Sequence, residues 1–257
     1  MSDQKDGTRK KESNISTLAV IPARYGSTRL PGKPLAPIGG VPLVLRVLDG
    51  VRATPGLDEI IVATDDERIA KVVRDHGGRA VMTPPDLPSG GDRVAWVAER
   101  REAEIVLNIQ VDDPFVGPDF ISPLVDALKS DPSSSLAVLA KRIDREEEID
   151  NPNIVKMVFD RSFRALYFSR SRIPYPRNAA TDYYKHIGPY AYRRDFLLSF
   201  MKWEQTPLER TESLEMLRVL EMGRSIRCVP CGRDTIEIDC PEDIAACEAY
   251  MRSHGVR

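Results

Sequence analysis

The feature that most constrains the fold is an alternation of short apolar runs and helical segments over the first 130 residues. Continuous apolar runs predict buried strands at 18–21, 59–64, 80–82 and 105–111. Helical patterns between them predict helices that begin at 42–48 and that cover 68–76 and 93–101. This order predicts an α/β fold with a mostly parallel sheet flanked by helices. Ligands of such sheets bind beyond the carboxyl ends of the strands.

The second half of the chain is less regular. Apolar runs predict strands at 135–143, 154–159, 165–168, 186–192 and 226–231, and a polar loop is expected at 178–184. A long amphipathic helix is expected over 208–222. Residues 1–16 are polar and lack aromatic side chains, which predicts a disordered tail. No repeat or change of composition divides 17–257, so we expect a single domain there.

Composition excludes several classes of protein. Lys and Arg number 37 and Asp and Glu 39, so the formal net charge is −2, which argues against a protein that coats nucleic acid. No apolar run approaches the roughly 18–20 residues that span a membrane, and the polar N-terminus lacks the apolar core of a secretory signal. We therefore expect a cytoplasmic protein with no membrane and no nucleic-acid partner.

The four cysteines leave one alternative to consider. Cys228 and Cys231 have a spacing that zinc sites use, whereas Cys240 and Cys247 do not form a second such pair. Reduced thiols in a cytoplasmic protein are the favoured interpretation. The zinc alternative predicts about one metal ion per chain.

The loop after the first predicted strand, residues 22–34, has the chemistry of an anion site. Arg24, Arg29 and Lys33 are spaced by glycines and small hydroxyl side chains. Glycines let backbone N–H groups approach an anion, and the cations neutralise it, so a polyphosphate is the expected ligand. The loop fits neither the Walker A pattern nor the dinucleotide G-x-G-x-x-G pattern. A solvated surface turn is the alternative, which the position between strand and helix disfavours.

Residues Ile21-Pro22-Ala23-Arg24-Tyr25-Gly26-Ser27-Thr28-Arg29-Leu30-Pro31-Gly32-Lys33-Pro34-Leu35 resemble the signature of sugar-acid cytidylyltransferases. The resemblance is nearest to the 3-deoxy-manno-octulosonate (Kdo) cytidylyltransferase group, the CMP-Kdo synthetases. It extends from residue 18 to about 250 through further segments: Ser89-Gly90 with Asp92-Arg93, Asn108-Ile109-Gln110 with Asp112 and Pro114, Asn151-Pro152-Asn153 with Val155-Lys156, 165–170 with Ile173-Pro174, His186-Ile187-Gly188 with Tyr190, Leu208-Glu209 through Leu217-Arg218, and Asp239 with Pro241-Glu242-Asp243.

This resemblance implies a Rossmann-like nucleotidyltransferase fold of the GT-A-like kind, with a β-rich dimerisation arm at about 150–185 and a homodimer as the assembly. It implies an Mg²⁺-dependent enzyme in which an oxygen of a small acid attacks the α-phosphate of CTP. The products are then a CMP-linked acid and pyrophosphate. Cations on the phosphates and a bridging metal ion are what such a displacement needs.

The resemblance also assigns roles to residues. The expected catalytic residues are Arg24, Lys33 and Asp112, and the expected Mg²⁺ ligands are Asp112 and Asp239. The expected CTP-binding residues are Ala23, Arg24, Ser27, Arg29, Lys33, Ser89, Gly90, Gln110 and Asp112. The expected acceptor-binding residues are Arg93, Gln110, Arg170, His186, Tyr190 and Glu215.

Some of these residues have plainer alternatives. Without the resemblance, His186 reads as a core histidine of a strand, and Arg93 could simply begin a helix. Asp112, Asp113 and Pro114 on their own read as a turn that ends a strand. Successive side chains of an extended segment point to opposite faces, so Asp113 is given a weaker role than Asp112.

Departures from the Kdo pattern gather around the acceptor. They are Leu87, Gly91, Val111, Asp113, Met216 and the run Glu237-Ile238-Asp239-Cys240-Pro241. Lost polar partners would leave buried acceptor hydroxyls unpaired, at about 1–3 kcal/mol each. The hypothesis that follows is a smaller acid, for example a phosphonate such as phosphonoformate in a natural-product pathway. The first alternative is a CMP-Kdo synthetase proper that serves lipopolysaccharide biosynthesis. A glycosyltransferase or another nucleotidyltransferase on a related fold, and a non-catalytic effector-binding protein, are further alternatives.

Overall fold

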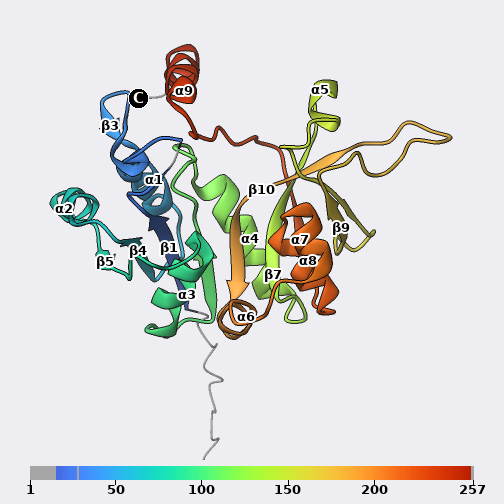
Figure 1. Cartoon of the computed structure of the whole chain (residues 1–257), viewed down its shortest axis with the longest axis horizontal. Helices are drawn as coiled ribbons and strands as arrows, with labels where there is room; N and C mark the ends of the chain where they lie inside the picture. The colour runs from blue at the N-terminus through green and yellow to red at the C-terminus, as the bar shows by residue number, and fades with distance from the viewer. Residues whose placement is uncertain (1–15, 28, 256–257) are drawn as a thin grey trace, which may run out of the picture.

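A mixed nine-stranded sheet forms the centre of the part of the chain that the structure, a computed structural model, describes: residues 16–27 and 29–255 (Figure 1). The principal strand order is β11-β7-β10-β6-β1-β4-β5. Its strands are β1 (Thr17–Ala23), β4 (Glu59–Thr64), β5 (Ala80–Met82), β6 (Ile105–Asn108), β7 (Leu136–Arg142), β10 (Tyr184–Arg193) and β11 (Ile226–Cys231). The predicted tail lies almost entirely outside the described residues.

The pairs β6–β1, β1–β4, β4–β5 and β11–β7 are parallel, whereas β10 is antiparallel to both β6 and β7. The mostly parallel α/β sheet expected from the sequence is therefore confirmed. Because β10 runs the other way, its first half lies at the same edge as the carboxyl ends of β1 and β6. Tyr190 is opposite Asn108, the last residue of β6.

Two apolar cores cover the two faces of this sheet. Alternate residues of β1 belong to different cores, as the period of a strand requires: Ala19 and Ile21 lie in one, Leu18 and Val20 in the other. The first core is filled from helices α1 (Leu43–Arg52), α2 (Glu67–Asp75), α4 (Pro118–Ser130) and α9 (Pro241–His254). The second is filled from α3 (Gly90–Glu99), α6 (Arg194–Phe200) and α8 (Glu215–Glu221).

The remaining elements are short. They are the 3-10 helix η1 (Lys33–Leu35), the hairpin β2 (Pro37–Ile38) and β3 (Val41–Pro42), and the helices α5 (Glu146–Ile149) and α7 (Pro207–Glu212). The predicted arm contains the antiparallel pair β8 (Lys156–Phe159) and β9 (Ala165–Ser169), and β8 also pairs with the start of β10. The connection from β9 to β10 projects from the body of the molecule in Figure 1.

Two predicted elements differ from the structure. The strand expected over 105–111 ends at Asn108, and 109–111 form a loop that leads to Asp112. The single helix expected over 208–222 is instead α7 and α8, because Ser213 between them is left-handed at φ 54°. Helices α4, α5, α6 and α9 were not predicted from the sequence. No helix within the described ranges is long and apolar enough to cross a membrane.

Candidate active site at the carboxyl edge of the sheet

Lys33 joins three segments that are far apart in the sequence. Its ammonium group lies 3.4 Å from Asp112 Oδ2 and 3.2 Å from Asp239 Oδ1, and it donates a hydrogen bond of 2.9 Å to the carbonyl oxygen of Ile238. Arg29 pairs with the other oxygen of Asp239 at 3.1 Å. The two carboxylates predicted to bind metal and two cations of the predicted phosphate loop therefore meet at one place.

Backbone contacts bring these segments together. The loop after β6 carries Asp112, whose carbonyl oxygen accepts a hydrogen bond of 2.8 Å from the backbone N–H of Ile238. Ile238 is fully buried and anchors the segment between β11 and α9 in the first core. Asp239 follows directly, which explains why it can reach Lys33.

The phosphate loop is held at its base. The backbone N–H of Tyr25 donates to Asp65 Oδ1 at 3.1 Å, and the carbonyl oxygen of Tyr25 accepts from the backbone N–H groups of Ser27 and Gly32. Gly32 has φ +70°, and a Cβ there would lie 3.1 Å from the Tyr25 ring. Glycine is therefore required at this position both by the backbone and by the close approach of the ring.

The other loop residues lie around this base. Ala23 ends β1 and is buried, whereas Arg24 is exposed and makes no hydrogen bond or ion pair with any residue that the structure describes. The Ser27 hydroxyl accepts a hydrogen bond from the Leu30 N–H at 3.4 Å. Arg24 is thus a loop cation with its charge free to meet a ligand.

Ser89 and Gly90 form the start of α3. The Ser89 hydroxyl accepts from the Asp92 N–H at 3.1 Å and donates to the Asp92 carboxylate at 2.6 Å, which caps the helix. A Cβ on Gly90 would lie 3.4 Å from Pro22, so the start of α3 packs against the end of β1. Both predicted CTP-binding residues therefore lie beside the phosphate loop.

The acidic groups of the site affect one another. Burial raises the pKa of Asp112, with Lys33 opposing the shift and Asp239 adding to it. Burial also raises the pKa of Asp113 to about 7, and its Oδ2 is buried without a hydrogen-bond partner among the described residues. Desolvation by the surrounding protein, and then repulsion from Asp112 and Asp239, raises the pKa of Glu237 to about 7, although the residue as a whole is exposed. The site concentrates negative charge next to Lys33.

A second group of predicted residues forms the adjoining wall. Gln110 Nε2 donates to the Tyr190 hydroxyl at 3.4 Å, and the rings of Tyr190 and His186 lie edge to face with centroids 5.3 Å apart. Burial raises the pKa of Tyr190 well above its usual range, with further contributions from Glu215, Glu237 and Asp112. Gln110, Asp112 and Glu237 also line one small hollow with Gly188 and Pro189. The residues around Lys33 and the residues of this wall therefore form one continuous site.

His186 combines burial with an unused nitrogen. Its Nε2 is buried and has no hydrogen-bond partner in the described part of the chain. Burial lowers the pKa of His186 to about 4, so the ring is neutral at pH 7. A neutral imidazole in this wall can donate or accept a hydrogen bond without adding charge.

Arg93 lies in the first turn of α3 and is engaged elsewhere. Its guanidinium pairs with Asp65 at 3.1 Å and donates to the Thr83 hydroxyl and the Pro84 carbonyl oxygen, and only 2% of its side chain is exposed. Asp65 in turn holds the backbone of Tyr25. In this structure Arg93 therefore supports the phosphate loop, and its predicted role in acceptor binding stays a prediction.

Arg170 is also held by the protein itself. Its guanidinium donates to the carbonyl oxygens of Glu212, Pro152 and Ser213, and its backbone N–H donates to the Glu212 carboxylate. These contacts join the end of β9 to the turn between α7 and α8. The following helix begins with Glu215, an exposed residue whose pKa is raised by desolvation from the surrounding protein. The acceptor roles of Arg170 and Glu215 stay predictions.

The zinc alternative lacks ligands. Cys228 is buried in β11, burial raises its pKa to about 12, and Cys231 is half-buried with its thiol directed to the Arg233 carbonyl oxygen at 3.2 Å. Within 16–27 and 29–255, no group of three or more His, Cys, Asp or Glu side chains could hold a metal ion. A tetrahedral zinc site would need such a group.

Two residues of the site were not predicted. Asp65 directly follows the strand predicted at 59–64, and an acidic residue at the carboxyl end of a parallel strand was the available signal. Glu237 was noticed only as a departure from a pattern, although its carboxylate lies among the predicted site residues.

Comparisons with known proteins agree with this geometry. The profile described as "Cytidylyltransferase" matches residues 18–226. A 3-deoxy-manno-octulosonate cytidylyltransferase of Syntrophotalea carbinolica is 43% identical over 93% of this chain and 99% of its own length. An 8-amino-3,8-dideoxy-manno-octulosonate cytidylyltransferase of Shewanella woodyi is 44% identical over 92% and 99%. The structure of a CMP:2-keto-3-deoxy-manno-octonic acid synthetase complexed with CTP superposes with a TM-score of 0.89 at 41% identity, over 93% of this chain and 99% of that one. The chain belongs to the cytidylyltransferase family.

Proposed function

We propose that this cytidylyltransferase transfers CMP from CTP to an acid of the 3-deoxy-manno-octulosonate class and releases pyrophosphate. The observation that carries the proposal is the meeting of Lys33, Asp112 and Asp239 beside the wall formed by Gln110 and Tyr190. The CTP bound to the structural relative and the octulosonate acceptors named for the relatives support the choice of both substrates.

In this reaction a bond forms between an acceptor oxygen and the α-phosphorus of CTP, and the bond from that phosphorus to the pyrophosphate oxygen breaks. Arg24, Arg29 and Lys33 would neutralise the triphosphate and the leaving pyrophosphate. The wall of Gln110, Tyr190 and neutral His186 would orient the acceptor by hydrogen bonds. Positioning and charge neutralisation are the main contributions a protein makes to phosphoryl-type transfer.

Asp112 and Asp239 have the properties of Mg²⁺ ligands. Asp112 Oδ1 is buried and has no hydrogen-bond partner among the described residues, and both carboxylates lie beside the same ammonium group. Mg²⁺ takes one or two protein carboxylates together with phosphate oxygens, so two carboxylates suffice. When bound there, Mg²⁺ would supply Lewis-acid stabilisation of charge at the α-phosphate.

The charge of the wall favours an octulosonate over a phosphonate. Glu215, Glu237 and Asp112 all lie close enough to Tyr190 to raise its pKa. A compact phosphonate with two or more negative charges would be repelled by these carboxylates, whereas a sugar acid carries one charge and several hydroxyls that carboxylates can accept bonds from. The smaller acid expected from the departures is therefore the less supported of the two acceptors.

The carboxylates beside this wall also favour a second acceptor. An 8-amino-3,8-dideoxy-manno-octulosonate carries an amino group, and the relative from Shewanella woodyi is named for that substrate. An ammonium group would be attracted to carboxylates such as Glu215 and Glu237. This amino sugar acid is therefore our second candidate acceptor.

We also propose that two copies of the chain pair through the arm. Leu166 on β9 and Tyr175 in the projecting connection are 60% and 82% exposed, the two most exposed large apolar side chains among the described residues. Covering them with a second copy would bury this apolar surface. Light scattering of the wild type should give a dimer mass and Leu166→Asp a lower mass; a monomeric wild type would contradict the proposal.

The deciding experiment measures pyrophosphate release from CTP with each acid in turn. We expect turnover with 3-deoxy-manno-octulosonate or its 8-amino analogue, little with phosphonoformate, and CTP preferred over the other nucleoside triphosphates. Robust turnover with phosphonoformate alone would refute the choice of acceptor.

Asp112→Asn tests the site itself. The variant should lose at least about a hundredfold in kcat, since Mg²⁺ would lose one of its two carboxylate ligands and Lys33 would lose one of its two ion pairs. Asp126→Asn, an exposed position on α4, is the matched control and should retain wild-type activity. Undiminished turnover by Asp112→Asn would contradict the proposed role.

A further inference from the structure

The segment between β11 and α9, residues 232–240, carries both Glu237 and Asp239 and has no helix or strand of its own. It crosses above the carboxyl edge of the sheet in Figure 1. A segment without regular structure depends on individual contacts for its position.

The end near the site is fixed by the ion pairs of Asp239 with Lys33 and Arg29 and by three hydrogen bonds. Ile238 donates its backbone N–H to Asp112 and accepts from Lys33, and the backbone N–H of Asp239 donates to Asp243 Oδ2 at 2.8 Å. Earlier in the segment, Arg233 reaches Asp119 at 3.6 Å, in a pair with both side chains substantially exposed. An exposed pair of this kind contributes little.

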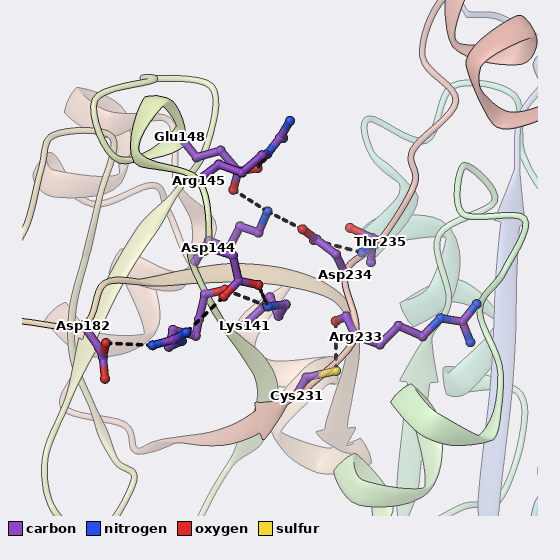
Figure 2. A network of polar contacts seen from close by, with 11 residues as sticks. Lys141, Asp144, Arg145, Glu148, Asp182, Cys231, Arg233, Asp234 and Thr235 are labelled. Atoms are coloured by element: carbon purple, nitrogen blue, oxygen red, sulfur yellow. Dashed lines mark hydrogen bonds and ion pairs between the residues drawn. The ribbon is translucent and has the colours of Figure 1, made fainter. Parts of the chain in front are cut away.

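The strongest contact at the other end is made by Lys185. Its ammonium donates to Asp234 Oδ2 at 2.7 Å and to Glu148 Oε2 at 2.7 Å. Glu148 lies on α5, is buried, and also pairs with Arg145. Figure 2 shows Glu148 and Arg145 on one side of this network and Asp234 on the facing segment.

The charges in this network balance, since two carboxylates meet two cations. Although burial opposes it, hydrogen bonds from Lys185 and Arg145 lower the pKa of Glu148, so the carboxylate is charged at pH 7. The Lys185 side chain is only 10% exposed. Charge-assisted hydrogen bonds shielded from water are stronger and more directional than exposed ones.

Lys185 also connects the wall of Gln110, Tyr190 and His186 with the 232–240 segment. It precedes His186 in β10, and adjacent strand residues point to opposite faces, so His186 faces the wall while Lys185 faces the network. The same strand thus carries predicted acceptor residues and holds the segment that carries Asp239.

We propose that Lys185 is a positioning residue, which fixes the 232–240 segment through Asp234 and thereby sets Asp239 and Glu237 relative to the acceptor wall. The proposal rests on the proposed function for its effect on catalysis but not for the contact itself. Because Ile238 and Asp239 keep their own contacts, loss of Lys185 should loosen the segment rather than release it. The structure thus implies a partial loss of metal affinity rather than its abolition.

The test compares four proteins: wild type, Lys185→Met, Lys185→Arg and Asp234→Ala. Asp234 is substantially exposed, so Asp234→Ala breaks the contact without leaving a gap in a core. Lys141→Met is the matched control, because Lys141 is a similarly buried lysine that pairs with Asp144 and not with the 232–240 segment. Thermal unfolding identifies any variant that does not fold.

Hydrogen–deuterium exchange of the ligand-free proteins is the first measurement. The peptide over 234–239 should exchange about tenfold faster in Lys185→Met and Asp234→Ala than in wild type, because local opening sets the rate. Lys185→Arg should restore most of the protection, and Lys141→Met should leave it unchanged. Equal exchange in wild type, Lys185→Met and Asp234→Ala would overturn the proposal whether or not the chain has the proposed activity.

Mn²⁺ binding, followed by electron paramagnetic resonance in the presence of CTP, is the second measurement. Partners that orient metal ligands typically account for 10–100-fold in affinity. Since Lys185 acts through the chain, we expect the lower end: about tenfold weaker Mn²⁺ binding in Lys185→Met and Asp234→Ala, and wild-type binding in Lys141→Met. In turnover assays the KM for CTP should change less than kcat. Wild-type Mn²⁺ affinity in both variants would refute the positioning role, whereas no turnover by the wild type would refute the proposed function alone.

Discussion

Lowering the pH should destabilise the folded chain, because the folded protein keeps His186 in its neutral form. The pKa of His186 is about 4 in the folded chain, against 6.5 for an exposed histidine, because burial disfavours the charged ring. Between these two values the unfolded chain binds a proton that the folded chain does not bind. The free energy of unfolding should therefore fall as the pH is lowered from about 6.5 to 4, and this contribution should be constant above and below that range.

The size of the effect follows from the two pKa values. The two pKa values differ by 2.5 (6.5 − 4), which corresponds to a loss of about 3 kcal/mol in the free energy of unfolding when the pH is lowered through the whole range between them. Lowering the pH from 7.5 to 4.5 covers most of the range between the two pKa values, so the free energy of unfolding should fall by about 2.5 kcal/mol. The ring is half-buried, so these values are upper bounds.

The assay is urea unfolding of wild type and His186→Phe at pH 7.5 and pH 4.5. The phenyl ring keeps the edge contacts with Phe168 and Tyr190 but cannot take up a proton. Wild type should lose up to about 2.5 kcal/mol more than the variant between these pH values. NMR titration gives an independent value, since the His186 ring signals are those missing from the variant. Equal losses in both proteins, or a titration midpoint near 6.5, would refute the reasoning.

Three further predictions concern stability. Gly50→Ala should destabilise by about 3 kcal/mol in urea unfolding, because the new Cβ would lie 1.9 Å from the Val116 carbonyl oxygen, whereas Gly26→Ala meets no atom within 4 Å and should change stability by less than about 0.5 kcal/mol. Burial raises the pKa of Asp113 to about 7, so ionising this carboxyl destabilises the folded chain as the pH rises from about 4 to 7. In the same unfolding assay, the free energy of unfolding of the wild type should therefore fall by about 2.5 kcal/mol more than that of Asp113→Asn between pH 5 and 8. Arg93→Met should cost about 3 kcal/mol, because it leaves a carboxylate buried without its cation, and should raise the KM for CTP through the loosened loop, while Arg93→Lys should recover part of both.

Much of the fold was accessible to sequence reasoning because local pattern decides it. Buried parallel strands are short continuous apolar runs, and the boundaries of β4 and β5 match their runs exactly as predicted at 59–64 and 80–82. The family was also predicted, on the phosphate loop, and is confirmed by the match over residues 18–226. Its residue roles and its metal ion stay predictions.

The errors have a common physical origin in tertiary context. The amphipathic pattern over 208–222 does not reveal that the chain turns at Ser213, where a left-handed residue lets Arg218 of α8 pair with Glu209 of α7 in a buried, two-bond contact. The apolar run at 105–111 continues past the last residue that β10 pairs with, so the strand ends at Asn108. Neither event has a local signal strong enough to override periodicity.

Contacts of long sequence separation could not be predicted from pattern at all. Lys33 and Asp239 are 206 residues apart, and the burial of Ile238 together with its backbone hydrogen bonds to Asp112 and Lys33 brings them together. The partner of Arg93 likewise could not be predicted, because the sequence does not show which acidic residue a basic residue in the first turn of a helix will pair with.

The pairing of Lys33 with two carboxylates has a consequence for how the proposed reaction begins. Asp112 and Asp239 would repel each other if both were charged without a cation between them; burial is the main cause of the raised pKa of Asp112, and this repulsion adds to it. In the ligand-free chain the ammonium of Lys33 offsets that repulsion from 3.4 and 3.2 Å. Asp112 and Asp239 would hold Mg²⁺, which would supply positive charge to the same two carboxylates, and the ammonium of Lys33 would then be available to the phosphates. With either cation beside them, the carboxylates would avoid the cost of a buried unpaired charge.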